Sequence, residues 1–125
     1  MNHAGKRILL VEDSEDSRFS LSKLLQLEGY AVLEAIDGAQ AIEVATREKP
    51  DLILMDLSLP LVDGITATRT IREVQGLEAT PIIALSGHDA DTIRSDAKAA
   101  GVTDYANKPI DFDLLMSLLS RYLSD

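Results

Sequence analysis

Short runs of β-prone, mostly apolar residues alternate along the chain with segments in which apolar residues recur every three or four positions. The runs have the length and composition of strands: RILLV (7–11), AVLEA (31–35), DLILM (51–55), PIIAL (81–85) and TDYAN (103–107). The segments that follow them have helical spacing, carried by Leu21, Leu24 and Leu25; Ala41, Ile42 and Ala45; Ile65, Thr68 and Ile71; Ile93, Ala97 and Ala100; and Phe112, Leu115, Leu119 and Tyr122. The pattern therefore predicts a strand followed by a helix, repeated five times.

This alternation predicts a mostly parallel sheet with right-handed crossovers and with helices covering both of its faces. Burial on both faces explains why RILLV, DLILM and PIIAL are apolar almost throughout, instead of at alternate positions. Sheets of this kind bind ligands outside the carboxyl ends of their strands. The residues that follow the five runs are therefore the first candidates for function.

Charged and hydroxyl residues follow four of the five runs. In chain order they are Glu12 and Asp13, then Asp56, then Ser86, and finally Lys108 with Pro109 after it. Asp56 is expected where a strand gives way to a surface loop, because Ser58, Pro60 and Gly64 are turn-forming residues. Since the ends of parallel strands share one edge of the sheet, three carboxylates, a hydroxyl and an ammonium are predicted to converge there.

Three carboxylates at close range repel one another, so the predicted cluster favours a bound cation. Mg²⁺ fits best, because it prefers hard oxygen ligands and is commonly held by one or two carboxylates together with a phosphoryl group. Lys108 adds a positive charge suited to a phosphate oxygen or to ionised Asp56. These groups are typical of phosphoryl transfer, and they predict that Asp56 is a nucleophile that forms an acyl phosphate.

The composition favours one folded domain spanning residues 1–125, with residues 1–5 expected to form a disordered leader. Hydrophobic residues make up 46% of the 125 residues and charged residues 26%, as in ordinary globular proteins. The 21 acidic residues against 12 basic ones disfavour direct binding to nucleic acid. With no cysteine, disulfides and thiolate metal sites are excluded. No signal peptide or membrane-spanning run is visible, so a cytoplasmic protein without membrane association is expected.

The sequence resembles the receiver domain of two-component response regulators over nearly its whole length. Four motifs carry the resemblance: LLVEDSEDSR, DLILMDLSLPLVDG, PIIALSG and GVTDYANKP. Each motif alone has a simpler reading, such as a loop carboxylate or a turn, and their joint placement favours the functional one. The resemblance implies a flavodoxin-like, doubly wound (βα)5 fold with strand order 2-1-3-4-5, as in the single-domain chemotaxis regulators.

The resemblance also implies a role for the residues at the strand ends. Asp56 would accept a phosphoryl group from the phosphohistidine of a histidine kinase or histidine phosphotransfer protein, in a reaction that needs Mg²⁺ or, in its place, Mn²⁺. The implied metal ligands are the side chains of Asp13 and Asp56, the backbone carbonyl of Ser58, and Glu12 through a bound water. Ser86 would donate a hydrogen bond to the phosphoryl group, and Lys108 would form an ion pair with it.

Further expectations from the family concern switching and the lifetime of the acyl phosphate. Tyr105 would be the switch aromatic, whose ring turns inward as Ser86 is drawn to the phosphoryl group, and the Lys108–Pro109 peptide bond would be cis. Ser58 and His88 would flank the phosphoryl group, so substituting either is predicted to change its lifetime more than its formation. An unknown downstream protein would bind the face formed by the fourth helix, fifth strand and fifth helix.

Two functions from other classes compete with a signalling switch, which would catalyse only its own phosphorylation and dephosphorylation. A Mg²⁺-dependent phosphohydrolase with the same aspartyl nucleophile generally needs a carboxylate two residues later, where this chain has Ser58. A flavin-binding module needs small residues in the loop after the first strand, where Glu12 and Asp13 would repel the cofactor. The switch is favoured, and a chain of this extent suits a stand-alone receiver or one excised from a larger regulator or hybrid kinase.

Overall fold

Strands and helices alternate along the chain in the order that the hydrophobic pattern predicts. The computed structural model describes residues 5–57, 63–87 and 91–123, and for residues 91–94 the backbone alone; Ser58 and His88, with their predicted roles, lie outside these ranges. The elements are β1 (Arg7–Val11), α1 (Glu15–Leu27), β2 (Ala31–Ala35), α2 (Gly38–Glu48), β3 (Leu52–Asp56), α3 (Gly64–Arg72), β4 (Ile82–Ser86), α4 (Asp91–Ala100), β5 (Asp104–Asn107) and α5 (Phe112–Leu123).

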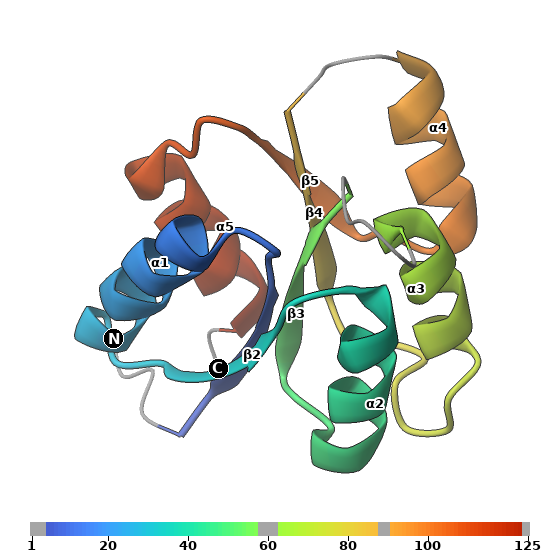
Figure 1. The fold of residues 1–125 in the computed structure, drawn as a ribbon, viewed down its shortest axis with the longest axis horizontal. Coiled ribbons are helices and arrows are strands. Elements are labelled where there is room, and N and C mark those ends of the chain that lie inside the picture. Colours follow the sequence, from blue (N-terminus) through green and yellow to red (C-terminus); the bar gives the residue numbers. More distant parts are fainter. Residues whose placement is uncertain (1–4, 58–62, 88–90, 124–125) are drawn as a thin grey trace.

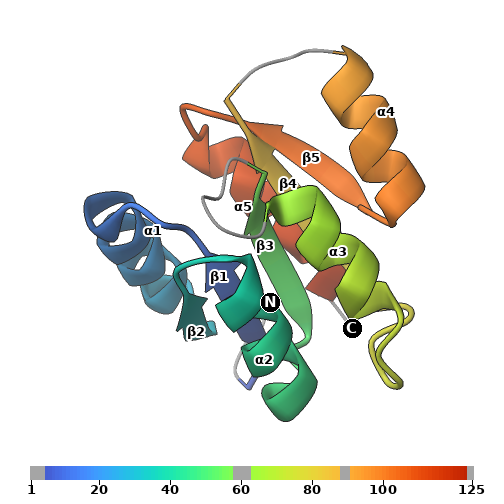
Figure 2. The same ribbon diagram turned by 45° about the vertical axis from the view of Figure 1, so that its right-hand side comes forward.

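The strands form one parallel sheet in the order β2-β1-β3-β4-β5, which confirms the expected topology. Helices α1 and α5 cover one face, and α2, α3 and α4 cover the other (Figures 1 and 2). Because every pair of neighbouring strands is parallel, all five carboxyl ends point to the same edge of the sheet. We call this the carboxyl edge, and the opposite one the amino edge.

Successive strand residues point to opposite faces and build two hydrophobic cores. One core lies under α2, α3 and α4 and includes Leu9, Val11, Ile53, Met55, Ile82 and Ala84. The other lies under α1 and α5 and includes Ile8, Leu10, Leu52, Leu54, Ile83 and Leu85. Burial on both faces accounts for the continuously apolar strands that the sequence pattern shows.

The structure corrects the prediction at the ends of the two central strands. Both strands were expected to end one residue earlier, yet the pairing continues through Asp56, which lies opposite Leu85, and β4 includes Ser86. Asp56 is therefore the last residue of a buried strand, and its exposed fraction is only 1%. β3 does end at Asp56, where the strand was predicted to give way to a loop, but Asp56 itself is still paired with β4 and buried.

The three leucines that predict α1 are not buried equally. Leu21 and Leu25 face the sheet as expected, but Leu24 is 39% exposed. Leu24 is one helical step, about 100°, from Leu25, so it lies at the margin of the buried stripe instead of within it. None of the helices in the described ranges is long and apolar enough to cross a membrane.

Candidate functional site

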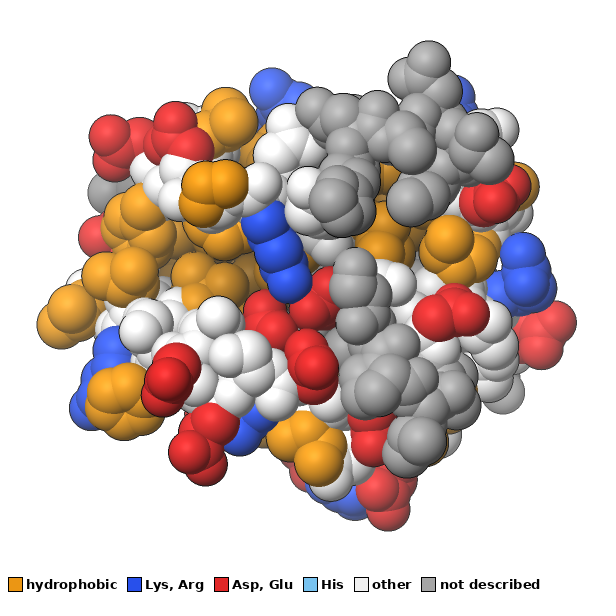
Figure 3. All heavy atoms as spheres, turned by 45° about the horizontal axis from the view of Figure 1, so that its top comes forward, with side chains coloured by type: hydrophobic (Ala, Val, Ile, Leu, Met, Phe, Trp, Pro, Cys, Tyr) orange, Lys and Arg blue, Asp and Glu red, His pale blue; other side chains and the backbone are white. Residues whose placement is uncertain are grey.

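Three carboxylates meet at the carboxyl edge, as the strand ends predict. Glu12 and Asp13 follow β1 directly, and Asp56 ends β3, the strand beside it. One oxygen atom from each residue lies within 4.8 Å of those of the other two. Glu12 and Asp56 are buried, whereas Asp13 is exposed. In the view from this side, acidic side chains gather beside a basic one (Figure 3).

Among the residues that the structure describes, Lys108, in the loop after β5, is the cation that contacts this cluster. Its Nζ lies 2.8 Å from Asp56 Oδ2 and 3.4 Å from Glu12 Oε1. Burial favours the neutral amine, but the hydrogen bond and charge of Asp56, together with those of Glu12, outweigh it and raise the pKa of Lys108. Lys108 is therefore a stable ammonium at neutral pH, available to offset negative charge at Asp56.

Burial of the Glu12 side chain removes its carboxylate from water and disfavours the ionised form. Burial raises its pKa above the usual 4.5; the backbone N–H of Ser14 works against this shift, and the negative charge of Asp56 adds to it. The Ser14 N–H donates to Glu12 Oε2 over 3.1 Å. One lysine thus offsets only part of the charge of three carboxylates, and a further cation would relieve the remainder.

The other predicted residues lie on the neighbouring strands β4 and β5. Ser86 is buried at the end of β4, and its carbonyl accepts a 2.8 Å hydrogen bond from the Lys108 N–H, which links the hydroxyl and ammonium residues. The Lys108–Pro109 peptide bond is cis. Tyr105 lies in β5, half-buried against the core under α2, α3 and α4. The structure thus brings Ser86 and Lys108 to the acidic cluster, with Tyr105 three residues before the lysine.

Gly64, the first residue of α3, allows this helix to begin directly against the backbone of Asp56. An added Cβ at Gly64 would lie 2.3 Å from the Asp56 carbonyl oxygen and 2.8 Å from Leu57 Cα. Asp63 caps the helix, because its Oδ1 accepts a 2.7 Å hydrogen bond from the Thr66 N–H. The start of α3 therefore packs directly against the Asp56 main chain at the end of β3.

Sequence reasoning missed two features of the site. The first is Arg18 of α1, whose Nη1 donates to the Glu12 carbonyl over 2.9 Å and whose Nε donates to Glu34 Oε1 over 3.0 Å. The second is a cavity of about 310 Å³ between α1 and the loop before α5. It is lined by Glu12, Ser17, Ser20, Leu21, Leu24, Leu85, Lys108, Pro109, Ile110 and Phe112. The marginal apolar position of Leu24 and the run Pro109, Ile110 were the available signals.

The donor set at this edge fits Mg²⁺. Carboxylate oxygens are the hard ligands that Mg²⁺ prefers, and Glu12, Asp13 and Asp56 present three of them within reach of one ion. No nitrogen or sulfur ligand of a softer metal joins the cluster among the described residues. The cluster of Glu12, Asp13 and Asp56 is therefore consistent with a Mg²⁺ site.

Comparison with known proteins agrees with this arrangement. The family described as response regulator receiver domain matches residues 8–120. The chain belongs to this family. The receiver is 34% identical to the protein PilH of Pseudomonas aeruginosa over 118 residues, which cover 94% of this chain and 98% of PilH.

Two solved structures are similar over almost the entire receiver. The receiver domain of the sensor histidine kinase PA1611 from P. aeruginosa, which holds a magnesium ion coordinated in its active-site cleft, has a TM-score of 0.90 and 38% identity. This match covers 98% of our chain and 100% of that one. The chemotaxis protein CheY4 of Vibrio cholerae has a TM-score of 0.91 and 31% identity, covering 96% of our chain and 100% of that one.

Proposed function

We propose that this receiver domain is a signalling switch that accepts a phosphoryl group on Asp56 in a Mg²⁺-dependent reaction. The observation that carries the proposal is the meeting of Glu12, Asp13 and Asp56 within 4.8 Å, with Lys108 Nζ 2.8 Å from Asp56 Oδ2. A cluster with this surplus of negative charge costs stability, and such a cost is expected where charge performs chemistry. Membership of the receiver family and the magnesium ion in the PA1611 receiver support the same assignment.

In this reaction an Asp56 carboxylate oxygen attacks the phosphorus of a phosphohistidine. The new O–P bond forms as the N–P bond breaks, and the histidine ring leaves with the electron pair of that bond and takes up a proton. Lys108 lies where its ammonium can follow the developing charge from Asp56 to a phosphoryl oxygen. A bound Mg²⁺ would supply charge neutralisation of the phosphoryl oxygens.

The proposed donor is a histidine kinase or a histidine phosphotransfer protein. Curated relatives of the chain include the sensor kinase/phosphatase CqsS of Vibrio cholerae and the sporulation initiation phosphotransferase F of Bacillus subtilis. The burial of Asp56 means that the donor must present its phosphoryl group at the carboxyl edge, because the other sides of this residue are covered by the sheet and α3.

Phosphorylation would then change the affinity for a downstream partner. Ser86 and Lys108 are joined through a backbone hydrogen bond, so movement of either toward a phosphoryl group is transmitted to β5, which carries Tyr105. The proposed readout face is formed by α4, β5 and α5. The phosphorylated state is stabilised relative to the other by the new contacts it makes.

The experiment is incubation with Mg²⁺ and a small acyl phosphate, followed by intact mass spectrometry. Wild-type protein is expected to gain one phosphoryl group that is stable in acid and labile in base. Asp56→Asn is expected to lose the adduct completely, because the amide cannot form an acyl phosphate.

Asp63→Asn is the matched control. Asp63 belongs to the same connection between β3 and α3, but its side chain caps the helix, a function that asparagine also performs. The control should be phosphorylated like wild type. An undiminished adduct on Asp56→Asn, or no adduct on wild type, would refute the proposal.

A further inference from the structure

Arg18 connects α1 to the acidic cluster without contacting a carboxylate of that cluster. Its Nη1 donates to the backbone carbonyl of Glu12 over 2.9 Å, and its Nε donates to Glu34 Oε1, on β2, over 3.0 Å. Only 15% of the Arg18 side chain is exposed. A side chain so placed, with both contacts made by one planar guanidinium, fixes the distance between two elements.

The Glu12 backbone is held from both sides. Its N–H donates to the Ala35 carbonyl over 3.0 Å, which extends the pairing of β1 and β2 by one residue. Its carbonyl accepts from Arg18 at the point where the chain leaves the sheet. Glu12 and Asp13, two of the three carboxylates, therefore begin a connection whose first two peptide groups are tied, one to β2 and the next to α1.

Glu34 in turn holds the guanidinium in place. Its Oε1 accepts from Arg18, and its Oε2 accepts from the Ser22 hydroxyl over 3.4 Å. Arg18 and Ser22 lie one turn apart on the same face of α1, so the three residues form a bridge between α1 and β2. The charges of Arg18 and Glu34 offset each other, and the bridge adds no net charge beside the cluster.

We propose that Arg18 is a positioning residue that sets the affinity of the receiver for its divalent cation by fixing the loop that carries Glu12 and Asp13. This inference rests on the proposed function, because it assumes that these carboxylates hold the ion. Replacing a residue that orients metal ligands without binding the metal itself typically weakens metal binding 10- to 100-fold.

Electrostatics alone makes the opposite prediction. Removing a positive charge near a cation site would tighten metal binding, since the repulsion between Arg18 and the ion would be lost. If positioning dominates, Arg18→Ala weakens binding in spite of the lost repulsion. The sign of the change therefore separates the two explanations.

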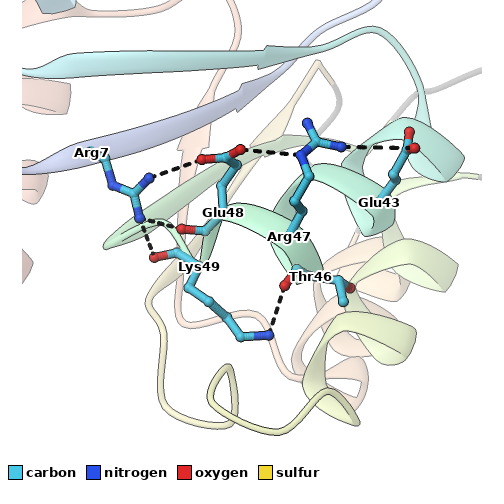
Figure 4. Close-up of polar contacts among 6 residues, drawn as sticks. All are labelled: Arg7, Glu43, Thr46, Arg47, Glu48 and Lys49. Atoms are coloured by element: carbon cyan, nitrogen blue, oxygen red, sulfur yellow. Dashed lines mark hydrogen bonds and ion pairs between the residues drawn. The ribbon is translucent and has the colours of Figure 1, made fainter.

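An arginine at the opposite end of β1 provides a matched control. Arg7, at the amino end of β1, donates to the backbone carbonyls of Glu48 and Lys49 and to the Glu48 carboxylate (Figure 4). Like Arg18 it ties β1 to a neighbouring helix through carbonyl and carboxylate groups, but it does so at the amino edge. Arg7→Ala should weaken the fold without affecting the ion.

The test is a Mn²⁺ titration of the wild-type protein, Arg18→Ala, Arg18→Lys and Arg7→Ala, with free Mn²⁺ measured by electron paramagnetic resonance and thermal unfolding measured on the same samples. Arg18→Ala is expected to raise the Mn²⁺ dissociation constant about 10-fold. Arg18→Lys, which keeps the charge but cannot hold both acceptors, should raise it less. Arg7→Ala should bind Mn²⁺ like wild type.

A kinetic measurement gives a second readout. With a small acyl phosphate as donor, the Mg²⁺ concentration for half-maximal phosphorylation should rise in both Arg18 variants, whereas the rate at saturating Mg²⁺ should stay near that of wild type. Unchanged or tighter Mn²⁺ binding by both Arg18 variants, or an equal loss in Arg7→Ala, would overturn the inference alone. A wild-type protein that binds no Mn²⁺ would overturn the proposed metal site itself.

Discussion

Acidic and basic side chains meet at both ends of β1, but the balance between their charges differs. At the amino edge, Arg7 and Arg47 contact Glu48, and Arg47 also contacts Glu43, so that each of these acidic groups has a basic partner (Figure 4). At the carboxyl edge, Glu12 and Asp56 contact Lys108, and Asp13 adds a third carboxylate. One edge is nearly neutral, and the other keeps a surplus of negative charge.

This difference separates what the fold requires from what the proposed function requires. The amino edge pairs its charges through side chains that are between 35% and 68% exposed. The carboxyl edge holds two of its charges on the buried side chains of Glu12 and Asp56, and the proposed function requires Asp56 to have a defined position. The negative charge at the carboxyl edge is only partly neutralised, which favours binding of a cation and, with the cation, of a phosphoryl group in the proposed function.

Gly64→Ala is expected to have the largest effect on stability, because it disrupts the packing of the carboxyl edge directly. The new methyl group would lie 2.3 Å from the Asp56 carbonyl oxygen, and a backbone atom cannot rotate away as a side chain could. We expect a loss of about 3 kcal/mol in the free energy of unfolding. Urea unfolding measures this loss, and phosphorylation by a small acyl phosphate should be slower because Asp56 is displaced.

Gly87→Ala provides the comparison at the same edge. Gly87 follows Ser86, and a Cβ there would meet nothing within 4 Å. We expect its stability to stay within about 0.5 kcal/mol of wild type. Equal stability of Gly64→Ala and wild type would contradict the close packing of α3 on Asp56.

The contrast between these glycines illustrates what the sequence could and could not predict. Asp13, Asp56, Ser86 and Lys108 were predictable because parallel strands bring their carboxyl ends to one edge whatever the details of packing. The close approach at Gly64 was not, because a glycine near a proline and an aspartate reads equally well as an ordinary turn.

The role of Arg18 was equally out of reach. Its two contacts depend on the angle at which α1 crosses the sheet, and Glu34 lies 16 residues away on β2. The burial of Asp56 also escaped the sequence, because pairing with β4 continues one residue beyond Met55, the last apolar position, to Asp56 opposite Leu85. Local pattern therefore locates the candidate site residues, whereas their supporting contacts arise from tertiary packing.

The pH dependence of stability sharpens the comparison by isolating the cost of charge at Glu12. Since burial raises the pKa of Glu12 above 4.5 in the folded, metal-free protein, the folded state holds its proton more tightly than the unfolded state does. The associated stability is complete below pH 4.5 and is lost as the pH rises through the raised pKa. Glu12→Gln cannot ionise, so it should not lose this stability. The variant should become more stable relative to wild type as the pH approaches neutrality.

Thermal unfolding of both proteins in buffers from acid to neutral pH, with chelator, measures this difference. Added Mg²⁺ should reduce it at neutral pH, because a bound cation favours the ionised carboxylate. If the difference in unfolding temperature between the two proteins stayed constant across the pH range, ionisation of Glu12 would not destabilise the folded protein.

The smallest effect is expected for Arg47→Ala at the amino edge. Its guanidinium lies 3.2 Å from Glu48 Oε2 and 3.9 Å from Glu43 Oε2, and 58% of its side chain is exposed. Exposed ion pairs contribute little, so urea unfolding should show a loss of about 0.5 kcal/mol or less, falling further at high salt. A loss above about 1 kcal/mol would mean that the amino edge depends on its charges as much as the carboxyl edge does. A small loss would mean that the ion pairs of Arg47 contribute little to the stability of the fold.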